Sequence, residues 1–79
     1  MERSIISSRE YFKLWTYFKE DTDYMAYIIC ANNEDGSETV FAVWEDMHGG
    51  GEVLCGTVEK ARKLLEDDGF CFVGYTETN

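Results

Sequence analysis

The stretch "YMAYIICANNEDGSETVFAVWE", residues 24–45, decides the fold of this chain. Its two halves, 24–32 and 38–45, are rich in β-branched and aromatic residues, as strands are. Between them lies "NEDGS", and its Asp35-Gly36 dipeptide is typical of tight hairpin turns. We therefore expect the two halves to pair as an antiparallel hairpin.

After the hairpin, "TVEKARKLLEDDG", residues 57–69, has the apolar period of an amphipathic helix. Thr57 is suited to cap the N-terminus and Gly69 to follow the C-terminus, so the sequence predicts a helix over 57–68. The apolar side chains on one face of this helix are Val58, Ala61, Leu64 and Leu65. The next run, "FCFVGYT" at 70–76, reads as a strand that returns beside the hairpin.

The first element, 8–19, has two interpretations. Ser7 to Glu10 fits a capping box, and Ile6 with Tyr11 fits a hydrophobic staple, which favours a helix. The aromatic run "YFKLWTYF" favours a strand. In either case the fold class is α+β: a small antiparallel sheet of three to four strands with one helix packed on it, in a single domain over 1–79.

The composition indicates a folded domain with an acidic surface. The chain has 79 residues, 44% hydrophobic and 15% aromatic, with 16 Asp and Glu against 7 Lys and Arg and a net charge of -9. The apolar fraction is too high for a disordered acidic tail. Acidity on this scale disfavours nucleic acids and anionic membranes as direct partners and favours cationic proteins.

The three cysteines indicate a reducing compartment. Cys30, Cys55 and Cys71 are odd in number and form no CxxC pair, so we expect reduced thiols and a cytoplasmic, soluble protein. Cys30 and Cys71 fall in expected strands, and we expect both to face the core. No run of the sequence approaches the length of a membrane span.

The segment "MHGGGEVLCG", residues 47–56, raises the question of a phosphate cradle. Glycine-rich loops at a helix N-terminus bind phosphate through backbone amides, commonly with a Lys or Arg beside them. Here the neighbours are carboxylates, and the spacing of a P-loop is absent. We therefore expect this segment to be a mobile connector. The carboxylates nearby are Glu45, Asp46 and Glu52.

No residue pattern predicts an enzyme or a metal centre. His48 and Cys55 are the only local pairing of a base with a thiol, and the sequence offers no third orienting group or oxyanion pattern beside them. The cysteines and His48 lack the close ligand pairs of zinc sites, and the acidic turns lack the spacing of a calcium loop. We therefore expect a non-enzymatic protein with no catalytic residue, no metal and no cofactor.

Charge layout is the most informative feature. Between Lys19 and Lys60 there is no Lys or Arg. The hairpin predicts two acidic clusters, one at its open end and one at its turn, each able to face a basic surface. Solubility is the alternative explanation for this acidity. The open-end cluster is Glu20, Asp21, Asp23, Glu45 and Asp46, the turn cluster is Glu34, Asp35 and Glu38, and Tyr24 and Trp44 are candidate apolar anchors.

In its size, its acidity and its cation-free segment between Lys19 and Lys60, this chain resembles phage-encoded inhibitors of bacterial defence, in particular anti-CRISPR proteins. The resemblance implies stoichiometric binding to a basic nucleic-acid-binding protein, a CRISPR effector subunit, which blocks access of DNA. We expect the inhibitor to act in the host cytoplasm as a monomer or weak dimer. The alternative is an antitoxin or regulatory module that neutralises a basic partner protein.

Overall fold

The computed structural model describes residues 12–33 and 35–78 of the chain. The predicted capping box at Ser7 to Glu10, the staple pair and Glu34 lie outside these residues. Along the described part of the chain, four strands are followed by one helix and a fifth strand. They are β1 (Phe12–Lys19), β2 (Met25–Asn32), β3 (Glu38–Trp44), β4 (Gly51–Cys55), α1 (Val58–Asp67) and β5 (Phe70–Thr78).

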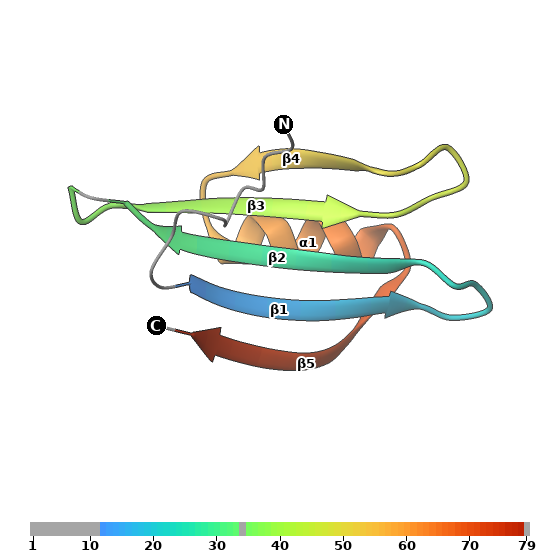
Figure 1. Cartoon of the computed structure of the whole chain (residues 1–79). Helices are drawn as coiled ribbons and strands as arrows, with labels where there is room; N and C mark the ends of the chain where they lie inside the picture. The colour runs from blue at the N-terminus through green and yellow to red at the C-terminus, as the bar shows by residue number, and fades with distance from the viewer. Residues whose placement is uncertain (1–11, 34, 79) are drawn as a thin grey trace, which may run out of the picture.

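The strands form one antiparallel sheet in the order β4-β3-β2-β1-β5, and α1 lies across one of its faces (Figure 1). The α+β class and the hairpin of β2 with β3 are confirmed. The expected three to four strands are too few, because the sheet has five. The final strand returns beside β1 instead of the hairpin, because α1 carries the chain across the sheet from the β4 edge to the opposite edge.

The first element is a strand, and its described part begins at Phe12. Tertiary pairing explains why strand wins over helix, since β1 is bonded to β2 on one side and to β5 on the other. Trp15 lies opposite Ile28, and Tyr17 lies opposite Ala26, so alternate side chains of β1 face the helix. An aromatic strand with partners on both edges buries more apolar surface than an isolated amphipathic helix would.

The segment interpreted from sequence as a mobile connector contains β4. Gly51 pairs with Trp44, and Cys55 pairs with Val40, so the second half of the glycine-rich segment is an ordinary edge strand. Gly49 and Gly50 have φ of 102° and 96°, and this left-handed backbone reverses the chain between β3 and β4. The expectation of a mobile connector is therefore wrong from residue 51 onward.

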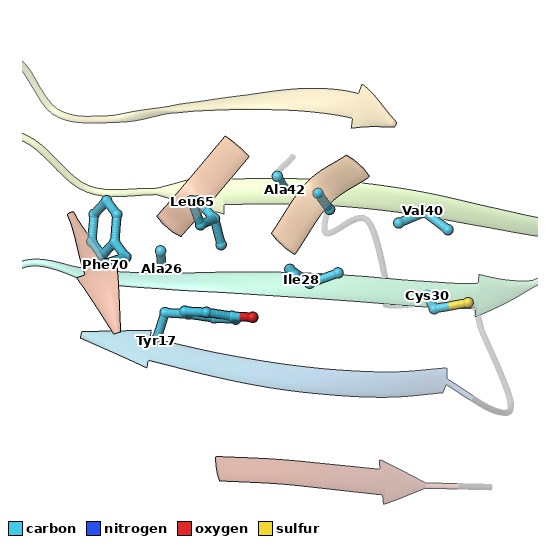
Figure 2. Packing of buried hydrophobic residues seen from close by; sticks show 9 residues of the cluster. Tyr17, Ala26, Ile28, Cys30, Val40, Ala42, Leu65 and Phe70 are labelled. Carbon is cyan, nitrogen blue, oxygen red and sulfur yellow. The ribbon is translucent and has the colours of Figure 1, made fainter. Parts of the chain in front are cut away.

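The core lies between α1 and the sheet (Figure 2). The strands contribute small side chains beneath the helix, Ala26 and Ala42, which let the helix pack closely. Around them lie the other members of the buried cluster, which are Tyr17, Ile28, Cys30, Val40, Ala61, Leu65 and Phe70. Cys71 is exposed, contrary to expectation, because it faces away from α1 while its neighbour Phe70 faces the core.

Local signals at the helix ends match the sequence prediction. The Thr57 hydroxyl accepts a hydrogen bond from the Lys60 backbone N–H at 3.1 Å, which caps the N-terminus of α1. Gly69 has φ of 95°, and its N–H donates to the Glu66 carbonyl at 3.0 Å. Across the described residues, no helix is both long and apolar enough to cross a membrane.

Candidate protein-interaction site

Three connections of the chain meet at one end of the sheet (Figure 1). They are the β1–β2 loop, the β3–β4 loop and the link from α1 to β5. Together they carry carboxylates that we call the acidic end. Its members are Glu20, Asp21, Asp23, Glu45, Asp46, Asp67 and Asp68. Within 19–24, 44–50 and 67–70 the only Lys or Arg is Lys19.

The side chain of Thr22 helps to hold the β1–β2 loop. The Thr22 hydroxyl donates to the Lys19 carbonyl at 2.7 Å and accepts from the Tyr24 N–H at 3.0 Å. Asp21 adopts a left-handed backbone with φ of 67°, which Asp tolerates better than most residues. The side chains of Glu20, Asp21 and Asp23 are exposed, so this loop presents three carboxylates to solvent.

The β3–β4 loop is shaped by one of the predicted carboxylates. Asp46 Oδ1 accepts hydrogen bonds from the backbone N–H groups of His48 at 2.8 Å and Gly50 at 2.9 Å. These two donors hold the pKa of Asp46 below its ordinary value. Asp46 is therefore ionised at neutral pH and positions the glycine turn as well as contributing charge.

Glu45 ties the two loops together. Its carboxylate accepts from the Met25 N–H at 2.9 Å, and its own N–H donates to the Met25 carbonyl at 3.0 Å. These bonds bring the start of the β3–β4 loop beside the end of the β1–β2 loop, as the hairpin model predicted. The five carboxylates of the predicted open-end cluster are thus gathered at one end of the molecule.

The structure adds two carboxylates that sequence reasoning did not place here. Asp67 and Asp68 end α1, and Lys19 Nζ lies 3.4 Å from Asp68 Oδ2. A groove runs between the helix end and the β3–β4 loop, and it combines an apolar floor with acidic walls. The residues that line it are Trp44, Asp46, Leu64, Leu65, Asp67 and Asp68.

The two predicted aromatic anchors are not free surface residues. Tyr24 and Trp44 are both partly buried and pack against the core cluster. The Trp44 ring lies over Gly51, where an added Cβ would stand 2.9 Å from its Cζ2 atom. Trp44 forms part of the apolar floor of the groove. The Tyr24 carbonyl closes the β1–β2 loop by accepting a hydrogen bond from the Lys19 N–H at 3.1 Å.

The turn cluster lies at the opposite end of the sheet, as predicted (Figure 1). Glu34 falls outside the described residues, while Asp35 and Glu38 are exposed. Asp35 Oδ1 accepts from the Ser37 N–H at 2.9 Å and the Ser37 hydroxyl at 2.6 Å, which lowers the pKa of Asp35. This end therefore presents fewer carboxylates than the acidic end.

The pairing of His48 with Cys55 is not formed. His48 lies in the loop before β4, and Cys55 is the last residue of β4, so about 15 Å of extended chain separates them. Burial raises the pKa of the Cys30 thiol, which suits a core side chain and not a nucleophile. In the part of the chain that the structure describes, no three His, Cys, Asp or Glu residues group as a metal site.

Comparison with protein-family models, with curated proteins and with solved structures finds no match to this chain. Its function therefore has to be inferred from the acidic end and from the chemistry that such a surface can recognise.

Proposed function

We propose that the protein is a non-enzymatic inhibitor whose acidic end docks onto the basic nucleic-acid channel of a larger complex, a CRISPR effector, and blocks DNA binding. The observation that supports the proposal is the meeting of three chain segments, with seven carboxylates and a single cation, at one end. A cluster of like charges speeds association with a surface of opposite charge. It also competes with phosphate groups for that surface.

In this proposal the groove receives a Lys or Arg side chain of the partner. Such side chains place an apolar stem on an apolar surface and keep the charged head in a polar environment. Here the stem lies on Trp44 and Leu64, and the head reaches the carboxylates of Asp46 and Asp67. Under this proposal Trp44 has a binding role that does not require it to be fully exposed.

The experiment compares two double variants with equal charge change. Asp23→Lys with Asp67→Lys alters the acidic end at two exposed residues that shape neither loop. Glu52→Lys with Glu59→Lys is the control, because both residues are exposed and lie outside the acidic end. Asp21 and Asp46 are left unchanged, since their replacement would also disturb backbone geometry.

Tagged wild-type protein and both variants are incubated with bacterial lysates at low and physiological salt, and retained proteins are identified by mass spectrometry. We expect wild type and control to retain a nucleic-acid-binding complex that then fails to bind DNA in a mobility-shift assay. The acidic-end variant should retain it at least about tenfold less. Retention of a small basic toxin would favour the antitoxin function, and equal retention by both variants would exclude the acidic end as the contact.

A further inference from the structure

The β5 edge of the sheet exposes three large apolar side chains. Phe72, Val73 and Tyr75 of β5 are 55%, 61% and 45% exposed. The strand order places β5 at the end of the sheet, and among residues 12–33 and 35–78 no strand lies on its outer side (Figure 1). Within the described residues β5 is therefore an edge strand, the kind of strand that can pair with a strand of another chain.

The features that usually protect an edge strand are weak on β5. Edge strands are commonly kept short or carry Lys or Pro, whereas the nine residues of β5 include no Lys, Arg or Pro and one charged residue, Glu77. The single irregularity is a register shift opposite Thr16 and Tyr17, at which Val73 has no partner. The other edge, β4, has five residues and carries Glu52 near its middle.

The aromatic side chains of β5 form the outer row of a layer that continues from β1. The ring centroid of Tyr75 lies 4.9 Å from that of Trp15, and the ring centroid of Phe72 lies 5.7 Å from that of Tyr17. Both rings thus pack on the helix side of the sheet while much of each remains in solvent. A further strand with aromatic side chains on the same side would extend the layer and bury these surfaces.

We propose that this edge pairs with β5 of a second copy, antiparallel about a two-fold axis, so that one sheet runs through both molecules. In such a pairing the same residues are presented by each copy, and Phe72 comes opposite Tyr75 of the second copy. The interface brings aromatic side chains of one copy against aromatic side chains of the other. It also pairs the uncharged middle of β5 with the same segment of the second copy. A strand from an unrelated protein is the other possible occupant, and the experiment below separates the two.

The net charge of -9 does not prevent this dimer. Phe70 begins β5 at the acidic end, and Thr78 ends it at the far end of the sheet. An antiparallel arrangement therefore sets the two acidic ends apart by about 25 Å along the strands, several times the screening length of about 8 Å in physiological salt. The acidic end stays exposed in the dimer, so this inference does not depend on the proposed function.

The test is sedimentation equilibrium of the full chain from micromolar to millimolar concentration at physiological salt. We expect the mass to rise from 9.1 kDa towards twice that value. Val73→Lys places a charge on the β5 edge and should weaken dimerisation about tenfold or more, even though it lowers the net negative charge. Leu54→Lys is the matched control, because Leu54 is 65% exposed on the opposite edge strand.

Hydrogen exchange of the wild-type protein gives a second readout that needs no variant. Amides of 70–78 should exchange more slowly as concentration rises, while those of 51–55 should not change. A single-chain mass at every concentration would overturn the proposal, as would a dimer that survives Val73→Lys or is abolished by Leu54→Lys. A single-chain mass would leave a strand of an unrelated protein as a candidate occupant of the edge.

Discussion

The Lys19 ammonium lies 3.4 Å from Asp68 Oδ2 and 4.8 Å from the centroid of the Phe70 ring. This ion pair joins the end of β1 to the link between α1 and β5. The last turn of α1 carries no basic residue, although Glu66, Asp67 and Asp68 crowd its negative end. Lys19 supplies the missing cation from a neighbouring strand.

We expect Lys19→Met to lower the free energy of unfolding by about 1 kcal/mol, because it removes a partly exposed ion pair and a cation–π contact. Each of these interactions alone contributes less than about 1 kcal/mol. Urea denaturation measures the loss. Lys63→Met is the control, since Lys63 is exposed on α1 and its removal makes the same change in net charge. An equal loss in both variants would show that net charge, and not the Lys19 contacts, sets the effect.

Neighbouring glycines of the β3–β4 loop should respond differently to alanine. An added Cβ at Gly49 meets nothing within 4 Å, so Gly49→Ala should cost only the left-handed backbone strain, about 1–2 kcal/mol. At Gly50 the Cβ would stand 2.0 Å from the Trp44 carbonyl oxygen. Gly50→Ala should therefore cost roughly 3 kcal/mol or more, because backbone has to move. Thermal unfolding of both variants tests the order, and equal costs would contradict it.

Local signals explain what the sequence could predict. Some features depend only on neighbours within a few residues, and these could be predicted. They are the Asp35-Gly36 turn with the strands beside it, the Thr57 cap and the end of the helix at Gly69. Whether 12–19 is a strand depends instead on β2 and β5, which are distant in sequence. The sequence did not predict the five residues of β4 as a strand, because the turn glycines directly before them are typical of a loop.

The missed strand also explains why the sequence did not predict Asp67 and Asp68 at the acidic end. Elements of this fold run alternately towards and away from one end of the sheet, so each additional strand reverses the direction of all that follow. Without β4 the direction of α1 relative to the hairpin is undetermined. With β4 included, the ends of β1, β3 and α1 fall together, and Asp67 and Asp68 join the predicted carboxylates.

The hydrogen bonds to Asp46 predict a pH dependence. Because the folded-state pKa of Asp46 is below its ordinary value of about 3.9, the ionised carboxylate stabilises the fold above about pH 4 and loses this effect as pH falls through the folded pKa. The stability difference between wild type and Asp46→Asn should therefore be constant near neutral pH and shrink in acid. Chemical denaturation across this range measures it.

Asp23→Asn is the control for that pH series, because it removes the same charge from the acidic end without touching the β3–β4 loop. Nuclear magnetic resonance of the Asp46 carboxyl carbon gives the titration directly. A midpoint at or above the ordinary value for aspartate would show that the His48 and Gly50 donors do not bind the carboxylate in solution.

The contact of α1 with the sheet should dominate the stability of this small domain. Leu65 is 1% exposed and belongs to the core cluster, whereas its neighbour Leu64 is 39% exposed. Leu65→Ala removes buried methyl groups and leaves a cavity, a change that costs about 2–5 kcal/mol. The free energy of unfolding of a domain is typically only about 5–15 kcal/mol, so this loss removes a large part of the total stability.

Leu64→Ala is the matched control and should cost about 1 kcal/mol or less, because little surface returns to water. Circular dichroism in urea gives both values, and the slope of the transition checks that the unfolded state is unchanged. A larger loss for Leu64→Ala than for Leu65→Ala would mean that α1 is rotated to bury Leu64 in place of Leu65. That rotation would also move Asp67 and Asp68 away from the groove, so the same pair of variants tests the geometry of the acidic end.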